Sequence, residues 1–381
     1  MGDWGEILKE LSESVQFNNG RPDHDGIRRK YLAQAAAHTG RSTILYASKF
    51  TQPPSQNIGQ FVTISDGDLQ GIMTVIHKLP GRKLDLILHS PGGSPQAAEA
   101  VVSYLRSRFS HIRVIVPHLA MSAATMIACA ADVVVMGKHS FLGPIDPQLV
   151  LGDGRGQGVV PAEAILDQFD LAKKECSDPK HMGAWIPILP QYGPALLIQC
   201  NHALALAKNL VEDWLQKYML KRSPERKEKA KQIAEWLGRH DNWKSHSRHI
   251  PRDELKRRGF RIEKLEKDRK AQDLFLSVFH ATTHTFTGTA AVKIIESNLG
   301  KAFINQTGTA QVNVPVPADQ PSLPPAGADA PSSPSPEPSG QLPAGVPGPT
   351  SKRPQKTVRR KSAARKVSRG KRNRREKQSG T

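Results

Sequence analysis

The stretch VPHLAMSAATMIACAADVVVM, residues 116–136, decides the fold of this chain. It starts at the end of a β-branched run, passes through Ser122 into an Ala-rich helical segment, and ends in a second β-branched run. A turn of the same kind lies about thirty residues upstream, where LDLILHS at 84–90 is followed by a Gly-Gly turn at 91–94 and another helical segment. Two successive strand-turn-helix units predict a parallel sheet with right-handed crossover helices.

The rest of the N-terminal half alternates in the same way. Short β-branched runs predict strands, and apolar residues at helical spacing predict helices. In chain order, we expect strands at 43–47 and 60–64, a helix from Asp68, a strand at 84–89, a helix at 96–109, a strand at 112–116, a helix at 122–130 and a strand at 133–136. The strands are almost entirely apolar, which is typical of a sheet covered on both faces. The predicted fold class is therefore α/β.

Beyond Gly143 the pattern becomes mostly helical. A Gly-rich loop at 152–158 precedes expected helices at 163–174, 195–220, 225–237 and 252–258, and the segment at 274–296 is also predicted to be helical. The N-terminal segment, 1–41, is amphipathic at its start and is predicted to be helical as well. These assignments place one structured domain at 42–305, after that helical segment.

The C-terminal fifth of the chain has a different composition. Residues 306–350 are rich in Pro, Ala, Ser and Gly, so they cannot bury enough apolar surface to offset chain entropy, and we expect a disordered linker. Residues 351–381 form a basic tail with fourteen Lys or Arg and one acid, Glu376, and hold +13 of the net charge of +19. The tail has no aromatic residue. We interpret it as a solubilising segment, as a phosphate-binding segment for nucleic acid without sequence recognition, or as a segment attracted to an anionic membrane.

Cysteine usage and hydropathy suggest a reduced compartment. Cys129, Cys176 and Cys200 have neither the paired spacing of a zinc site nor the even count of a disulfide framework. No stretch approaches the ~18 to 20 apolar residues that span a bilayer, and the N-terminus lacks the basic flank and apolar core of a signal peptide. We expect a cytoplasmic protein, free or peripheral to a membrane, that uses no metal and no cofactor.

The two turns suggest acyl transfer. A serine at the start of a helix can present its hydroxyl to a substrate, and a Gly-Gly turn can direct backbone N–H groups at an oxyanion. The alternative for Ser122 is a structural one, because a serine before an Ala-rich helix often serves only as its N-cap.

Three motifs in order resemble the Clp-protease and crotonase superfamily. They are SerProGlyGlySer at 90–94, AlaMetSerAlaAlaThr at 120–125 and GlyProIleAspPro at 143–147. Within the superfamily, the chain looks most like the signal peptide peptidase A branch and its relatives, the serine dehydrogenase proteinases. The phrase HSRHIPRDELKRRGFRIEKLE at 246–266 looks like the closing segment of that branch, a helix that turns into the final strand.

The resemblance implies a serine peptidase with Ser122 as nucleophile and an oxyanion hole from the N–H groups of Gly92 or Gly93 and of Ala123. The Clp proteolytic subunit has a histidine about twenty-five residues after the serine, where this chain has IleAspPro at 145–147. The signal peptide peptidase branch uses a lysine instead. Lys174 is the preferred candidate, with a solvated helix end as its structural alternative; the other candidates are Lys173, Lys180 and Lys208.

Several other polar side chains have weaker claims. His118 and His139 flank the serine and could act as bases, but turn positions explain them equally simply. Asp146 lies between prolines, so it could shape a substrate groove or hold the base in place. The group His240, His246 and His249 matches no zinc spacing, and we do not assign a metal to it.

The sequence therefore favours a serine peptidase that cleaves peptides or proteins and assembles as a homo-oligomer. Two other classes stay open. A crotonase-like acyl-CoA enzyme would use the same oxyanion geometry without a nucleophile, and a non-catalytic scaffold would present the basic tail to nucleic acid.

Overall fold

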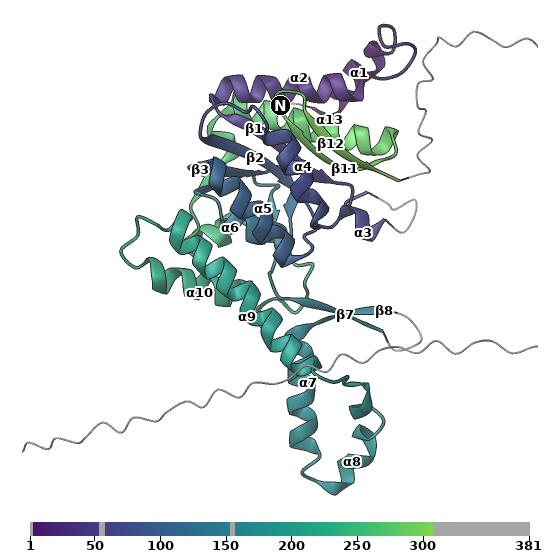
Figure 1. Cartoon of the computed structure of the whole chain (residues 1–381), viewed down its shortest axis with the longest axis vertical. Coiled ribbons are helices and arrows are strands. Elements are labelled where there is room, and N and C mark those ends of the chain that lie inside the picture. Colours follow the sequence, from purple (N-terminus) through teal and green to yellow (C-terminus); the bar gives the residue numbers. More distant parts are fainter. Residues whose placement is uncertain (1–2, 53–57, 153–156, 308–381) are drawn as a thin grey trace, which may run out of the picture. The chain divides into compact units, whose positions relative to one another are not determined.

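A mixed β-sheet lies between two layers of helices (Figure 1). The computed structural model describes residues 3–52, 58–152 and 157–307. Within these residues the main sheet has the order β10-β5-β3-β2-β1-β11-β12. The first five strands are parallel to one another, and β11 pairs antiparallel with both β1 and β12. The strands are β1 (Ser42–Ser48), β2 (Lys83–His89), β3 (His111–Val116), β5 (Val133–Met136), β10 (Ile262–Lys264), β11 (Ala291–Ser297) and β12 (Ala302–Gln306). The predicted α/β class with a mainly parallel sheet is confirmed.

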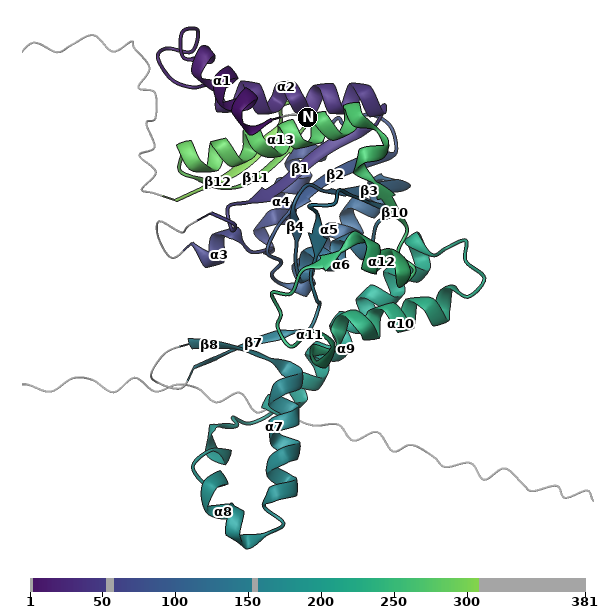
Figure 2. The same cartoon turned by 180° about the vertical axis from the view of Figure 1, so that it is seen from behind.

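Helices cover both faces of the sheet, as the apolar strands predicted. Figures 1 and 2 show α2 (His24–Thr39) and α13 (Arg269–Gly288) together on one face, and α4 (Gly67–Ile76), α5 (Pro95–Arg108) and α6 (Ala123–Cys129) on the other. Alternate residues of β1 pack against the helices on the two faces. Leu45 belongs to the cluster under α2 and α13, while Ile44 belongs to the cluster under α4 and α5. α1 (Trp4–Ser14) packs on α13 and α2.

A second group of elements comes mostly from the chain after β5, joined by β4, which precedes β5. A small sheet joins β4 (Leu119–Ala120), β6 (Phe141–Leu142) and β9 (Ile250–Pro251), and β7 (Gln148–Gly152) pairs with β8 (Gln157–Pro161) as a hairpin. α7 packs on α9, and α9 packs on α6 and α10. The helices here are α7 (Ala162–Glu175), α8 (Pro179–Trp185), α9 (Leu196–Trp214) with a π-helical turn at Leu215–Met219, α10 (Arg226–Gly238), α11 (His240–Trp243) and α12 (Arg252–Arg257), with 3₁₀ turns at Leu189–Gln191 and Leu265–Lys267.

Two predicted elements are wrong. The run at 60–64 forms the short helix α3 (Gly59–Val62), and only Ile64 pairs, in a single bridge with Gly93. The segment at 274–296 is helical only as far as Gly288, after which the chain enters β11. β11 is buried between β1 and β12, so pairing on both sides decides its conformation.

The remaining expectations concern the ends of the chain and the Gly-rich loop. Strands β7 and β8 flank that loop, whose residues 153–156 lie outside the described part, as do the linker and basic tail beyond residue 307. None of the helices in the described ranges is both long and apolar enough to cross a membrane.

Candidate active site

Two loops meet at one edge of the sheet, where β2 and β3 end. Because neighbouring parallel strands end at the same edge, the segments that follow them lie side by side. The Ser90 N–H donates to the Leu119 carbonyl at 3.2 Å, and the Met121 N–H donates to the Ser90 carbonyl at 2.9 Å. These bonds hold the Gly-Gly turn at 91–94 against the turn that contains Ser122.

Ser122 has the backbone conformation of a strained turn. It occupies the N-cap position of α6 with φ 52° and ψ −121°, a region that side-chain-bearing residues rarely adopt and that costs about 1 to 3 kcal/mol. Its hydroxyl makes no capping hydrogen bond to α6. The side chain is half-buried, and its hydroxyl is not used to cap the helix.

The Gly-Gly turn packs directly on the serine and on a neighbouring segment. Gly92 has φ 97°, and a Cβ there would lie 2.6 Å from the Met121 carbonyl oxygen and 2.6 Å from the Ser122 Cβ. Gly93 has φ 150°, and a Cβ there would lie 2.4 Å from both the nitrogen and the oxygen of Ile64. Both positions therefore require glycine, for the backbone angle and for the space.

Within the described part of the chain, two backbone N–H groups near the serine have no acceptor. The Gly92 N–H donates to the Ser90 hydroxyl at 3.2 Å. Among the residues that the structure describes, the N–H groups of Gly93 and Ala123 form no hydrogen bond. This pair has the donor chemistry of an oxyanion hole.

Lys174 lies on α7, a different element from the two turns around the serine. It is exposed near the end of α7, a helix that packs on α9, β8 and α8. Across the described ranges it forms no hydrogen bond or ion pair with Ser122 or with the Gly-Gly turn. One chain by itself does not bring this lysine and the serine into hydrogen-bond contact.

Among the described residues, none of the other lysines considered from the sequence forms a hydrogen bond with Ser122. Lys173 forms an ion pair with Asp170 at 2.5 Å, and Lys208 forms one with Glu235 at 2.6 Å. Lys180 is exposed on α8.

Asp146 holds two histidines that the sequence separates from it by about a hundred residues. Its carboxylate is buried, and it bonds to Nδ1 of His240 at 2.8 Å and to Nδ1 of His246 at 2.7 Å. Gly143, at the start of the same loop, packs on Met121, the residue before the serine. Sequence reasoning weighed the two imidazoles only as metal ligands. Nothing in the local sequence indicated that they would share one carboxylate.

His89 and His118 lie together at the ends of β2 and β3. Their rings are stacked with centroids 5.8 Å apart, and Phe279 lies against both. Burial lowers the pKa of His89 from 6.5 to about 3, with His118 contributing further. Burial also lowers the pKa of His118, followed by the nearby His249. These imidazoles are therefore neutral at pH 7.

Acidification should destabilise the protein through His89. Below pH 6.5 the unfolded chain binds a proton at this residue that the folded chain does not, so stability present above pH 6.5 is lost as the pH falls toward 3. At pH 5 the loss is about 2 kcal/mol. Urea unfolding at pH 7.5 and pH 5 measures how far the free energy of unfolding falls between the two pH values. This fall should be larger by about 2 kcal/mol in the wild type than in His89→Gln. Equal drops in the two proteins would refute this role.

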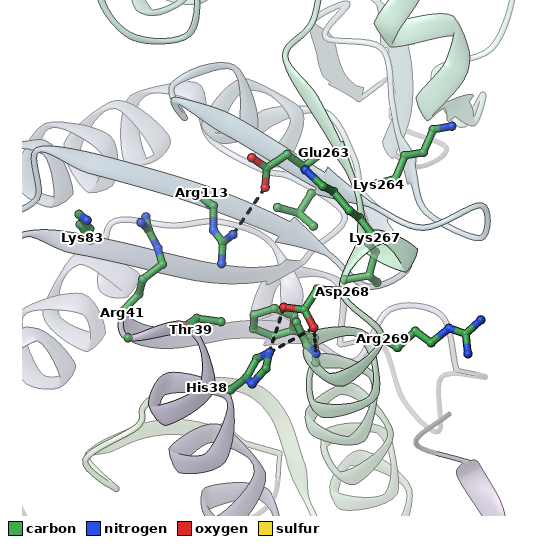
Figure 3. A pocket seen from close by; sticks show the side chains of 15 residues that line it. His38, Thr39, Arg41, Lys83, Arg113, Glu263, Lys264, Lys267, Asp268 and Arg269 are labelled. Carbon is green, nitrogen blue, oxygen red and sulfur yellow. Dashed lines mark hydrogen bonds and ion pairs between the residues drawn. The ribbon is translucent and has the colours of Figure 1, made fainter.

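A cavity of about 680 Å³ lies at the other end of the sheet (Figure 3). Arg41, Lys83 and Arg113 line it at the amino ends of the parallel strands, and His38 pairs there with Asp268. Ser122 follows the carboxyl end of β3, so this cavity does not belong to the site around the serine.

Comparison with known proteins matches the sequence to a known family. The ClpP-like SDH-type serine proteinases match residues 55–275, more than half of the chain and inclusive of both turns. The chain belongs to this family. The resemblance carried by the three sequence motifs is thereby confirmed.

Two curated relatives of this chain come from Methanocaldococcus jannaschii. The uncharacterized protein MJ0137 is 42% identical over 108 residues, which cover 28% of this chain and 34% of the relative. The uncharacterized protein MJ1495 is 36% identical over 123 residues, which cover 32% of this chain and 38% of the relative. The chain thus spans about a third of the length of each.

A solved structure of a mutant of the 1510-N membrane-bound stomatin-specific protease is also similar. It aligns with a TM-score of 0.32 and 16% identity over 52% of this chain and 74% of its own.

Proposed function

We propose that this proteinase hydrolyses peptide bonds through an acyl-enzyme on Ser122. The observation that carries the proposal is the serine itself. It occupies a strained N-cap position, its hydroxyl forms no capping hydrogen bond, and it packs against the Gly-Gly turn. Backbone strain that is not offset by a stabilising contact of the same residue is common at reactive residues. Membership of a serine-proteinase family supports the same chemistry.

The reaction can be written with the groups around the turn. The Ser122 oxygen attacks the substrate carbonyl carbon while a base takes its proton, and the carbonyl oxygen becomes an oxyanion. The N–H groups of Gly93 and Ala123 donate to that oxyanion. The C–N bond then breaks, the amine leaves with the proton, and water hydrolyses the ester in a second cycle of the same steps.

Of the competing classes, an acyl-CoA enzyme of the crotonase type would leave Ser122 unreactive, and a scaffold would not need the free N–H groups. A fluorophosphonate probe separates these classes from a peptidase. We expect a covalent adduct that mass spectrometry maps to Ser122. Folded protein that acquires no adduct would exclude the peptidase.

We keep Lys174 as the proposed general base, supplied within a homo-oligomer. Since α7 does not reach the serine in one chain, a second copy would have to present Lys174 to it. A histidine on Asp146 is the alternative, because a carboxylate at Nδ1 leaves Nε2 available, as in a Ser-His-Asp arrangement.

Lys174→Ala should lower the rate of fluorophosphonate labelling by about 100-fold or more, the usual contribution of a positioned base. The matched control is Lys173→Ala, which removes the neighbouring lysine and its ion pair with Asp170 and should label within about 2-fold of the wild-type rate. If Lys174→Ala is labelled at the wild-type rate, Lys174 is not the general base. The same measurement on His240→Ala and His246→Ala would then test the histidines.

The proposed substrate is a peptide or protein. A partner for the basic tail, whether nucleic acid or an anionic membrane, and a cytoplasmic location stay predictions from the sequence.

A further inference from the structure

A buried polar cluster lies under the active-site edge, and the proposed reaction does not use it. Lys293 on β11 and Asp68 on α4 are both about 1% exposed, and their ion pair has Nζ–O distances of 2.7 and 2.9 Å. Tyr46 on β1 donates its hydroxyl to the same carboxylate at 2.8 Å. The three residues, here called the Lys293 cluster, come from three different elements, and 225 residues separate Lys293 from Asp68 in the chain.

The Lys293 cluster holds a short segment from both sides. The Lys293 ammonium donates to the Thr63 carbonyl at 2.7 Å. The Asp68 carboxylate accepts from the Ser65 N–H at 2.8 Å. The residue between these two attachments is Ile64, whose own N–H and carbonyl are left free to bond elsewhere.

Ile64 uses those two groups to hold the Gly-Gly turn. Its N–H donates to the Gly92 carbonyl at 2.7 Å, and its carbonyl accepts from the Ser94 N–H at 2.9 Å. The Gly93 Cα is so close to Ile64 that no Cβ fits between them. A continuous set of bonds therefore leads from the buried ion pair to the peptide groups on each side of Gly93.

We propose that the Lys293 cluster is a positioning device for oxyanion binding, which acts through Ile64 to hold the Gly93 N–H in place. The inference rests on the proposed function of Ser122. Tyr46, Asp68 and Lys293 are positioning residues that need not touch the substrate.

Stability alone is a poor explanation for this cluster. A buried ion pair is often no more stabilising than apolar residues of the same volume, because desolvation offsets the attraction between the charges. A fixed geometry is what such a pair can provide here, since each partner holds one side of Ile64. Burial raises the pKa of Tyr46 well above its ordinary value, with Asp68 contributing, so the hydroxyl remains a donor throughout the neutral range.

The same strand offers a matched control. Glu296, three residues beyond Lys293 on β11, forms an equally buried ion pair with Arg28 at 2.5 Å. Its other partner is Arg29. No hydrogen bond in the described ranges connects this pair to residues 63–65 or 90–94. Glu296→Gln therefore disturbs a comparable ion pair without touching the Gly-Gly turn.

Hydrogen exchange in the full chain tests the mechanical part of the inference. In Asp68→Asn, the amides of Ile64 and Ser94 should exchange at least about 10-fold faster than in the wild type, because their bonds lose the anchored segment. Tyr46→Phe removes one hydroxyl and should show a smaller change in the same amides. Glu296→Gln should leave both amides at the wild-type rate. Unchanged exchange in Asp68→Asn would overturn the proposal, and Tyr46→Phe decides the matter if Asp68→Asn does not fold.

Fluorophosphonate kinetics test the catalytic part. In Asp68→Asn the maximal labelling rate should fall by about 10- to 100-fold, because a displaced N–H donor no longer stabilises the oxyanion of the transition state. The probe concentration that gives half the maximal rate should change by less than about 3-fold. Glu296→Gln should label at the wild-type rate. Two results would exclude the positioning role. One is faster amide exchange in Asp68→Asn with an unchanged labelling rate, and the other is an equal fall in labelling rate in Asp68→Asn and Glu296→Gln. Wild-type protein that forms no Ser122 adduct would instead refute the proposed function, while the exchange result still reports on the bonds themselves.

Discussion

Ser122→Ala is expected to abolish fluorophosphonate labelling and to lower peptide hydrolysis by at least about 10⁴-fold, since loss of a serine nucleophile removes most of the catalysis in comparable proteases. The same substitution should change the free energy of unfolding by less than about 0.5 kcal/mol. The hydroxyl makes no capping bond, and alanine keeps the Cβ that already tolerates φ 52°. Urea unfolding and probe labelling of one preparation measure both quantities.

Ser94→Ala is the matched control, because Ser94 is a serine that does cap a helix. Its side chain accepts from the Ala97 N–H at 3.1 Å at the start of α5. We expect this variant to lose about 1 kcal/mol of stability and to keep its adduct on Ser122. If Ser122→Ala instead lost stability like a cap variant and still hydrolysed peptides, the serine would be structural.

Gly93→Ala is expected to lower the maximal labelling rate by about 100- to 1,000-fold, the usual effect of losing one oxyanion donor. The new methyl group would lie 2.4 Å from the nitrogen and oxygen of Ile64, so the turn must move and carry the Gly93 N–H with it. Labelling of a folded variant at saturating probe measures this effect.

Gly40→Ala separates the steric effect from backbone strain. Gly40 also has a positive φ, 63°, at the C-cap of α2, but a Cβ there would meet nothing within 4 Å. This variant should lose about 1 kcal/mol of stability and label normally. Normal labelling by Gly93→Ala would exclude Gly93 as an oxyanion donor.

Local sequence was sufficient for the parallel part of the sheet. Strands β2, β3 and β5 are buried on both faces, so their apolar runs have one interpretation, and the helices between them carry helical spacing. Local sequence was misleading at 60–64, where the predicted strand is replaced by the end of α3 and a single bridge at Ile64. It was also misleading in β11, which pairs with a strand on each side. Gly93, the partner of Ile64, and β1, one of the two partners of β11, lie too far along the chain for a local pattern to show them.

Within the candidate site the same division holds. The chain itself contains the serine, the two glycines and their order, because each turn follows directly from its own strand. The bonds that connect the turns depend on folding: Asp146 meets His240 and His246 across 94 and 100 residues, and Lys293 meets Asp68 across 225. The proposed nucleophile on its turn is thus a local property of the sequence. Whatever base reaches it, and the buried ion pair behind the Gly-Gly turn, depend on side chains that only the packed sheet and its helices bring into contact.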